Sequence, residues 1–387
     1  MRSVPYLPQN KLTLLHSGAE FFPALEGAID SAQFEVVLET YIFSTDAVGQ
    51  RIKAALIRAA ARGVKVRVIV DWIGTGREYS AALDVEFGRS QVHYRIFNPW
   101  FRRGVTRSHR KLCVVDGALA FVGGLNLNDD LHCDYDDFKV LPAPRWDFAV
   151  QIAGPLVDLI HREANAQWAR LGKMNLVARI GLYRQLRELP ALASNKAMLA
   201  AFVVRDNLRN RRTIQRAYLQ ALGRSRKSVL LANPYFAPGH KFRNALARAA
   251  ARGVEVTLLI GVGEFRMQDA VAHSFYPKLL KSGVKVIEYR KTQLHGKVAV
   301  VDDDWATVGS SNFDGLSLFL NQEANVVVKD AVFSQSLRAH IERGIADGTP
   351  VLLDEFINMP WYRRAWYGAA FMIYRSLMRI VTMGGYA

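Results

Sequence analysis

A histidine and a lysine lie two positions apart near the start of the apolar stretch HGKVAVVD, residues 295–302. The alternation around Val298 and Val300 predicts a mostly buried β-strand, and side chains two apart on a strand share one face. His295 and Lys297 therefore point the same way from a buried face, where unpaired cations are rarely found. We expect an anionic group to bind there.

A second copy of this pattern occurs earlier in the chain, where residues 109–116 read HRKLCVVD. The histidine, lysine and aspartate of the two copies are His109, Lys111, Asp116, His295, Lys297 and Asp302. Each copy continues to a glycine-containing turn and an asparagine, represented by Gly124, Asn126, Ser310 and Asn312. In both copies the asparagine follows the histidine by 17 positions. The pattern is therefore duplicated as a unit.

The two copies belong to a longer internal repeat. The heptapeptide RAAARGV occurs at 58–64 and again at 248–254. Apolar strand patterns flank it on both sides in each half, at 36–43, 64–70, 229–236 and 254–260. Each half thus alternates strands with a helical pattern, which is typical of an α/β layer fold. A repeat of this length indicates a duplicated domain and not a solenoid unit.

We therefore predict an α/β protein made of two pseudo-symmetric domains, each a mixed, mostly parallel sheet flanked by helices. A pseudo-two-fold relation would bring both histidine-lysine strands to a shared interface, where the active site is expected. The expected units are an N-terminal domain, a basic helical connection, a C-terminal domain and a basic aromatic tail, at 1–170, 171–210, 211–348 and 349–387.

Composition narrows the class of protein. The chain has 387 residues, 50% of them hydrophobic, which is enough for one large core or two domains. It has only two cysteines, Cys113 and Cys133, and its first residues lack the apolar segment of a signal peptide, so we expect a reduced, cytosolic setting. The net charge of +16 would attract either nucleic acid or an anionic bilayer.

The duplicated residues predict a particular chemistry. Two imidazoles, two ammonium groups and two side-chain amides at one point suit a phosphodiester. The lysines would supply charge to a pentacoordinate oxyanion, so we expect neither a metal ion nor a cofactor. One neutral imidazole can attack phosphorus while the other, protonated, gives its proton to the departing alkoxide. The enzyme is then a transferase or a hydrolase, according to which hydroxyl enters second.

This duplicated pattern resembles the signature of the phospholipase D superfamily, and nearly the whole chain resembles the bacterial cardiolipin synthases of the shorter B type. The segments that carry the resemblance are VLETYIF, SHRKLCVVD, FVGGLN, LHGKVAVVDDDWATVGSSN and LSLFLNQEANVVV. The resemblance implies a phosphohistidine intermediate without a metal. It also implies transfer of a phosphatidyl group from one phosphatidylglycerol to another, with release of glycerol.

The resemblance also assigns roles to individual residues. His109 matches the nucleophile, and His295 matches the general acid that later acts as base. The matching phosphate-binding and adjoining turn positions are Lys111, Lys297, Asn126, Asn312, Gly124 and Ser310. The motif aspartates, which in the family support the site without contacting phosphate, are Asp116 and Asp302. The acidic residues expected against the distal nitrogens of the histidines are Asp147 and Glu323.

The C-terminal residues 361–387 carry four arginines and no acidic residue, and their longest uncharged apolar run has nine residues. A bilayer span needs about 20, so we expect this aromatic, basic helix to lie in the headgroup plane of an anionic membrane. A terminal helix packed on the core would show a similar pattern. We predict a peripheral protein on the cytoplasmic face of the inner membrane, with phosphatidylglycerol as its anionic partner.

Other functions are compatible with the same motifs. A phospholipase D, or a transphosphatidylase using another lipid or alcohol acceptor, would share every motif residue. A phosphodiesterase acting on nucleic acid would share the pocket chemistry, but the chain shows no nucleic-acid-binding motif or base-stacking platform, so no nucleic acid is expected as a partner. A membrane tether with a decayed site is disfavoured because both motifs are complete. No obligate protein partner is indicated.

Overall fold

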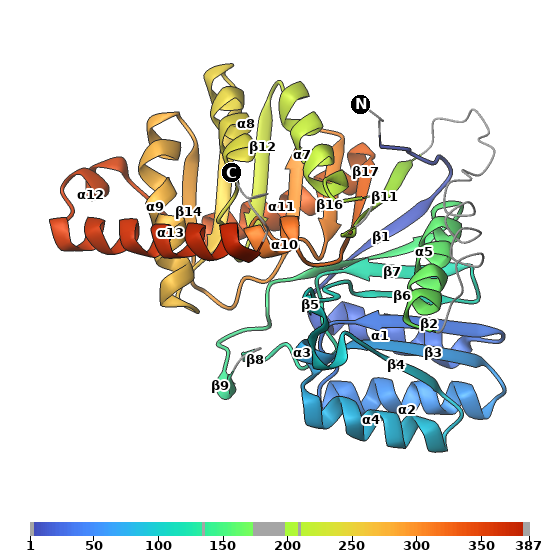
Figure 1. The fold of residues 1–387 in the computed structure, drawn as a ribbon. Coiled ribbons are helices and arrows are strands. Elements are labelled where there is room, and N and C mark those ends of the chain that lie inside the picture. Colours follow the sequence, from blue (N-terminus) through green and yellow to red (C-terminus); the bar gives the residue numbers. More distant parts are fainter. Residues whose placement is uncertain (1–3, 134–135, 173–197, 208–209, 382–387) are drawn as a thin grey trace.

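Two mixed β-sheets, each covered by helices, share a central core in the computed structural model, which describes residues 4–133, 136–172, 198–207 and 210–381 (Figure 1). The first sheet has the strand order β1 (Lys11–His16), β10 (Phe148–Ala153), β7 (Leu119–Gly123), β6 (Leu112–Val115), β2 (Glu35–Thr40), β3 (Lys65–Asp71), β4 (His93–Phe97). The second has the order β11 (Leu199–Arg205), β17 (Glu323–Lys329), β16 (Trp305–Gly309), β15 (Lys297–Val301), β12 (Ser228–Asn233), β13 (Glu255–Gly261), β14 (Lys285–Tyr289), β18 (Thr349–Pro350).

The two sheets repeat each other strand by strand. In both halves the strand that follows the histidine, β6 or β15, lies between a hairpin partner, β7 or β16, and the first strand of the half's parallel unit, β2 or β12. The short strand β18 extends the second sheet alone, and a bridge between Leu7 and Ala200 links the N-terminal segment to that sheet. The predicted α/β fold with two pseudo-symmetric halves is therefore confirmed.

The expectation that each sheet is mostly parallel is wrong. Only the β2–β3–β4 and β12–β13–β14 units pair in parallel, and the other named neighbours in both sheets pair antiparallel. The physical reason is the connection, because a parallel pair needs a long crossover whereas a tight turn joins antiparallel strands. Strands β6 and β7 are joined by the turn at Asp116 and Gly117, with no helix between them.

Helices cover the outer face of each sheet and also contribute to the shared core. The longer helices are α1 (Ser17–Ser31), α2 (Ala47–Ala61), α4 (Arg77–Arg89), α5 (Leu156–Leu171), α7 (Thr213–Arg224), α8 (His240–Ala251), α9 (Arg266–Lys281), α11 (Ala331–Ala346) and α13 (Trp361–Val381). The short elements are α3 (Trp72–Thr75), η1 (Pro99–Phe101), α10 (Gly315–Phe319), α12 (Leu353–Ile357), and the strands β5 (Arg102–Val105), β8 (His132–Cys133) and β9 (Asp136–Val140). The connection expected over 171–210 lies largely outside the described residues.

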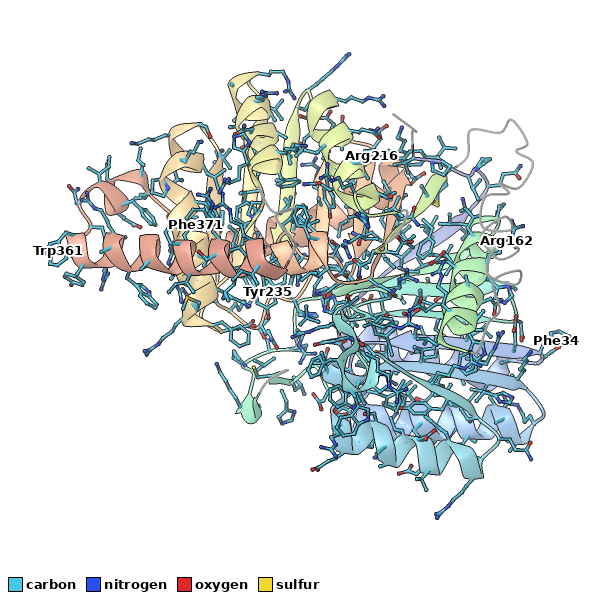
Figure 2. All side chains as sticks on the ribbon, in the orientation of Figure 1. Phe34, Arg162, Arg216, Tyr235, Trp361 and Phe371 are labelled. Carbon is cyan, nitrogen blue, oxygen red and sulfur yellow. The ribbon has the colours of Figure 1, made fainter. Side chains whose placement is uncertain are left out.

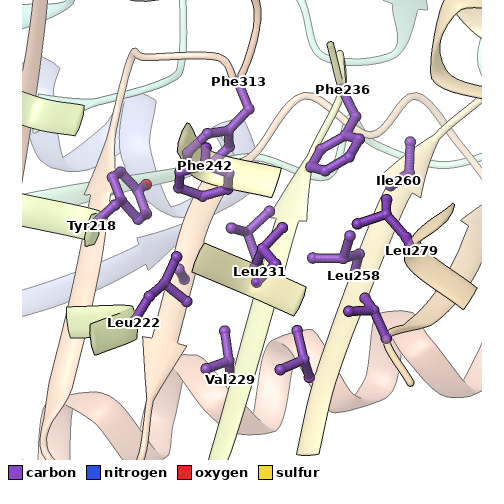
Figure 3. Packing of buried hydrophobic residues seen from close by; sticks show 14 of the residues in the cluster. Tyr218, Leu222, Val229, Leu231, Phe236, Phe242, Leu258, Ile260, Leu279 and Phe313 are labelled. Carbon is purple, nitrogen blue, oxygen red and sulfur yellow. The ribbon is translucent and has the colours of Figure 1, made fainter. Parts of the chain in front are cut away.

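Strand alternation sorts the apolar side chains into three cores. On β6, Leu112 and Val114 point into the central core, whereas Cys113 and Val115 join an outer core beneath α1, α2 and α4. The central core also takes Val298 and Val300 of β15, together with side chains of α5 and α11. A second outer core lies under α7, α8 and α9 (Figure 3). The central core thus fixes the two histidine-bearing strands relative to each other.

The repeated heptapeptide has the same structural task in both halves. It forms the last turns of α2 and α8, and its glycines, Gly63 and Gly253, adopt φ values of +88° and +86°. These left-handed conformations are readily adopted by glycine and end each helix. In each half the chain then enters the next parallel strand, β3 or β13.

The last helix, α13, lies across the second half, along α9 and toward α10 (Figure 1). Its packed face includes the fully buried Ala370 and the nearly buried Met378, and the Phe371 ring meets Phe275 of α9 at 5.2 Å between centroids. The hydroxyl of Tyr374 accepts a hydrogen bond of 2.6 Å from the backbone of Gly315. The tail is therefore packed on the protein along one face.

Candidate active site

Both histidines lie just before the central strands and not within them, because β6 begins at Leu112 and β15 at Lys297. Backbone contacts between the halves hold each histidine in place. The amide of His109 donates to the Gln322 carbonyl at 2.9 Å, and that of His295 donates to the Trp146 carbonyl at 3.0 Å. Each histidine is thus tied to the residue that precedes an acidic residue of the other half.

The imidazole contacts repeat this crosswise arrangement. Nδ1 of His109 lies 3.1 Å from Oε2 of Glu323, and Nδ1 of His295 lies 2.6 Å from Oδ2 of Asp147. Both carboxylates are essentially inaccessible to solvent. A carboxylate at Nδ1 fixes the ring orientation and leaves Nε2 as the nitrogen that faces a substrate. Each histidine therefore depends on the other half of the chain for its acidic partner.

The turn residues Gly124 and Ser310 shape the space for the two carboxylates. A Cβ atom at Gly124 would lie 2.2 Å from Oδ1 of Asp147, so this position requires glycine. At the equivalent position the Ser310 hydroxyl donates to Oε2 of Glu323, and the Ser310 carbonyl lies 3.0 Å from Nδ1 of His109. The longer acidic side chain is thus paired with a turn residue that offers it a hydrogen bond.

Both lysines are buried and hydrogen-bonded to the backbone of their own histidines. Nζ of Lys111 donates to the His109 carbonyl at 2.9 Å, and Nζ of Lys297 donates to the His295 carbonyl. Burial and the charges of Lys111, Lys297 and His295 together hold the pKa of His109 well below its usual value. The charges of both halves thus act on the same imidazole and favour its neutral form.

The two carboxyl groups respond to these charges in opposite ways. Burial raises the pKa of Glu323 to about 7, and the opposing influence of Lys111 is too small to reverse it. Burial also acts on Asp147, but there the charges of Lys297 and His295 outweigh it and lower the pKa to about 2. The carboxylate at His295 is therefore ionised at neutral pH, whereas burial favours the protonated form of the carboxyl at His109.

The two motif asparagines are buried beside the turns. Oδ1 of Asn126 accepts a hydrogen bond of 3.4 Å from the Ile42 amide. Oδ1 of Asn312 is buried and has no hydrogen-bond partner among the described residues. A buried polar atom without a partner is costly unless a ligand or water satisfies it.

The motif aspartates lie apart from this centre, beyond the opposite ends of β6 and β15. Asp116 accepts hydrogen bonds from the backbone amides of Gln33, Phe34 and Glu35 at 2.8–2.9 Å. Asp302 does the same for 226–228 at 2.7–3.1 Å. Both aspartates fasten the start of the neighbouring strand, β2 or β12. The structure thus gathers the histidines, lysines, asparagines, turn residues and distal carboxylates, but not these two aspartates.

Segments in both halves of the chain match one known protein family. Residues 25–135 and 218–345 match the family described as "Cardiolipin synthase, PLD-like domain". The chain belongs to this family. The two matched segments contain both histidine-lysine pairs, so the resemblance inferred from the sequence is confirmed.

Individual relatives in the family are similar over most of their length. Cardiolipin synthase B of Escherichia coli (strain K12) is 39% identical over 348 residues, which cover 87% of this chain and 81% of that protein. Cardiolipin synthase B of Salmonella typhi is 38% identical over 344 residues, covering 86% and 80%. Phosphatidylserine synthase of Haemophilus influenzae Rd KW20 has a similar structure, with a TM-score of 0.72 at 16% identity, covering 98% of this chain and 97% of that one. The last likeness shows a shared fold.

Sequence reasoning missed three side chains that anchor the segment before His109. The amide of Ser108 donates to the buried carboxyl of Asp71 at 2.7 Å, and its hydroxyl donates to Glu39. Burial raises the pKa of Asp71 to about 6 and also raises that of Glu39. The strand registers place Ala232 and Gly261 at the equivalent positions of the second half, so the repeat gave no signal for these carboxyls.

Tyr41, at the end of β2, is a further residue that the sequence did not single out. Its ring meets the His109 imidazole at 4.9 Å between centroids, and Nζ of Lys111 lies 5.1 Å from the ring. Its hydroxyl accepts a hydrogen bond of 3.1 Å from Arg107. The equivalent residue in the second half is Pro234. The only available signal was its place at the carboxyl end of a strand.

The unequal spacing between histidine and acid in the two halves also has a structural explanation. From asparagine to acid the first half has ten more residues than the second, 126–147 compared with 312–323. Strands β8 and β9 occupy that additional segment, whereas α10 lies at the corresponding place in the second half. The additional residues all lie before Trp146, which forms a β-bridge with Leu294. Asp147, the next residue, therefore still reaches His295.

Proposed function

We propose that this protein is a cardiolipin synthase, a phosphatidyltransferase that joins two phosphatidylglycerol molecules and releases glycerol. The carrying observation is the crosswise pairing of His109 with Glu323 and of His295 with Asp147, which creates one centre from two halves. The relatives named cardiolipin synthase B, similar over most of the chain, support the choice of lipid substrate.

In the first step His109 is the nucleophile. Its depressed pKa keeps the imidazole neutral near pH 7, so the Nε2 lone pair attacks the phosphorus of one phosphatidylglycerol. An N–P bond forms, and the bond between phosphorus and the headgroup glycerol oxygen breaks. His295, whose Nδ1 contacts the ionised Asp147, gives its proton to that oxygen, and free glycerol departs.

In the second step His295 acts as a base. The neutral His295 takes the proton from a headgroup hydroxyl of a second phosphatidylglycerol, whose oxygen attacks the phosphohistidine. A P–O bond forms as the N–P bond to His109 breaks, which yields cardiolipin and restores both histidines. Exclusion of water at this stage decides between transfer and hydrolysis, because water attacking the same intermediate yields phosphatidic acid.

The other site residues bind the phosphate in this proposal. Lys111 and Lys297 neutralise the oxygens of the pentacoordinate transition state, as buried cations do most effectively. Asn126 and Asn312 offer their amide groups, and binding would satisfy the buried Oδ1 atom of Asn312 through a headgroup hydroxyl or water. Gly124 and Ser310 place the supporting carboxylates, and Asp116 and Asp302 stabilise the strands that carry the centre.

We further propose that the protein works at the cytoplasmic face of the inner membrane without crossing it. None of the described helices combines the length and apolar character needed for a span. The outer face of α13 exposes Trp361, Trp366, Ile373, Leu377 and Ile380. An anionic bilayer would suit both this face and the net charge of +16. The phospholipid substrate would then be drawn from the surface to which the protein is bound.

The deciding experiment follows the lipid products. Purified protein is incubated with vesicles of glycerol-labelled phosphatidylglycerol, with and without excess chelator, and lipids and free glycerol are separated. We expect cardiolipin and released glycerol in equal amounts, at a rate that the chelator leaves unchanged, because the lysines supply the charge. Phosphatidic acid as the main product would instead support a hydrolase.

Two control arms distinguish the remaining alternatives. Added ethanolamine or another primary alcohol tests for a different acceptor, and single-stranded DNA tests for phosphodiesterase activity on nucleic acid. Conversion of phosphatidylglycerol to neither cardiolipin nor phosphatidic acid, or a strict need for one divalent ion, would contradict the proposal.

A further inference from the structure

A groove on the second half is lined by residues that do not belong to the histidine centre. It is formed by α8, α9 and α13, and it has a cavity volume of about 220 Å3. That is far more than the ~15 Å3 that a single water needs. Phe371, which contributes from α13, is labelled in Figure 2 on the side of the helix that faces α9. None of the groove's lining residues takes part in the proposed reaction.

The lining of the groove combines cations with an aromatic floor. Arg243 and Lys278 are its charged residues, and no aspartate or glutamate is among the described side chains that line it. The Arg243 guanidinium lies 4.4 Å from the Phe275 ring centroid, and Phe371 packs against the same ring at 5.2 Å. A guanidinium held flat on a ring is well placed to bind an anionic oxygen with its N–H groups.

Two hydroxyl oxygens complete the lining. The hydroxyl of Ser274 donates to the Val271 carbonyl at 2.6 Å, and that of Ser282 donates to the Leu279 carbonyl at 2.8 Å. Because both hydrogens are already used, the serine oxygens offer acceptors. The groove therefore presents donors for an anion and acceptors for hydroxyl groups, which together match a phosphate esterified to a polyol.

The position of the groove on α13 indicates the source of such a ligand. Arg375 lies one helical turn beyond Phe371 and so on the same side of α13, although it does not line the groove itself. The neighbouring outer face of α13 is apolar and exposed, with Met372 at 56% and Ile373 at 48% exposure. A band of cations beside an apolar face is the arrangement of a helix at the headgroup level of a bilayer.

We propose that this groove is a second, non-catalytic lipid site, which binds the phosphate headgroup of an anionic glycerophospholipid of the membrane. The acyl chains of that lipid would run along the exposed apolar face of α13 into the bilayer. Its occupation would hold the second half against the membrane and orient the histidine centre toward the lipid surface. The inference rests on the proposed function in assuming a membrane setting.

The test uses full-length protein with paired substitutions on the same two helices. The groove variant is Arg243→Gln with Lys278→Gln, and the matched control is Lys241→Gln with Lys281→Gln. The control pair is exposed, carries the same charge, and lies outside the groove lining. Binding is measured by co-sedimentation with phosphatidylcholine vesicles that contain phosphatidylglycerol, and with phosphatidylcholine alone.

We expect the groove variant to bind the anionic vesicles at least about a hundredfold more weakly than the control, since two charge-assisted hydrogen bonds are lost. Turnover of a short-chain, water-soluble phosphatidylglycerol should be the same in both variants. Equal weakening in the two variants, or binding of inorganic phosphate without selective vesicle binding, would overturn the inference. Failure of cardiolipin synthesis with the groove effect intact would count against the proposed function alone.

Discussion

At the scale of single residues, the two histidines occupy equivalent places in the repeat but differ in their surroundings. The carboxylate at His295 is ionised, with a pKa of about 2, whereas burial raises the pKa of the Glu323 carboxyl to about 7 beside His109. Tyr41 covers His109, and Pro234 stands at the equivalent place in the other half. These differences support the proposed roles of His109 as a neutral nucleophile and of His295 as the proton donor.

This asymmetry predicts which variant accumulates the covalent intermediate. With phosphatidyl-labelled substrate and an alkaline denaturing quench, His295→Ala should retain label on the protein, because attack by His109 is still possible. Its turnover should fall by about 10²–10⁴ because the general acid is lost. His109→Ala should carry no label, because it lacks the attacking nitrogen. The reverse labelling pattern would exchange the two roles and leave the fold unaffected.

Residues with a duplicate could be predicted from the sequence, and residues without one could not. The histidines, lysines and asparagines were found because the pattern occurs twice with one spacing. The crosswise partnership of His109 with Glu323 could not be read from the sequence, because it depends on how the two halves meet. Glu39 and Asp71 were missed because the second half has apolar or small residues at their positions.

At the scale of elements, we propose that the motif aspartates support the strands and take no part in the reaction. Asp116 adopts a φ of 52° and Asp302 one of 51°, a left-handed conformation that Asp tolerates better than most residues. From this position each carboxylate caps the amides at the start of the adjacent strand. The spacing of the motif therefore reflects two features of the strand. The histidine and lysine lie at its start, and the aspartate forms the turn at its other end.

We predict that Asp116→Ala lowers stability but not catalysis. The change removes hydrogen bonds from three backbone amides to a charged group, which should lower the free energy of unfolding by about 2 kcal/mol. Urea unfolding measures that loss, and kcat per folded molecule should stay near that of the unaltered protein. Asp303→Ala, which removes an exposed ion pair with Lys227, is the control and should leave the free energy of unfolding nearly unchanged. A large fall in kcat for Asp116→Ala would place this residue in the reaction.

The direction of strand pairing in the two sheets could be predicted only in part. The repeated strand-helix-strand pattern correctly predicted the parallel pairs β2–β3 and β12–β13, and it did not identify the third parallel strands β4 and β14. The remaining strands come from segments that the helical pattern does not separate, such as β6 and β7 around the Asp116 turn, so they pair antiparallel. Reading the turn at the motif aspartate as a hairpin would have corrected the prediction.

At the scale of the whole molecule, α13 combines the two interpretations of the tail that the sequence left open. One face packs on α9 through Phe371 and buries Ala370 and Met378, so the helix is part of the folded structure. The opposite face exposes large apolar side chains, with Trp361 at 80% and Ile380 at 76%. Deleting the helix would disturb the core and the outer face together. A test of the outer face therefore has to preserve the packed one.

The last prediction concerns that outer face, through the triple variant Trp366→Ser, Ile373→Ser, Leu377→Ser. All three side chains are about half exposed, so urea unfolding should change little. Binding to phosphatidylglycerol vesicles should weaken roughly a hundredfold, because partial burial of three such side chains is worth about 3 kcal/mol in all. Turnover of a water-soluble phosphatidylglycerol should not change, since the histidine centre is untouched.

The control for the triple variant replaces three apolar side chains that are more than half exposed and lie on other elements: Phe34→Ser, Val85→Ser, Val332→Ser. In Figure 2, Phe34 and Trp361 lie at opposite ends of the molecule, so a membrane docked along α13 would not reach Phe34. The control should bind vesicles as the unaltered protein does, because its changes are remote from the docked face. Equal loss in both variants would mean that exposed apolar area in general, and not the α13 face, determines membrane binding. Loss of turnover on the soluble lipid in the α13 variant would show instead that this face supports the catalytic centre through the fold.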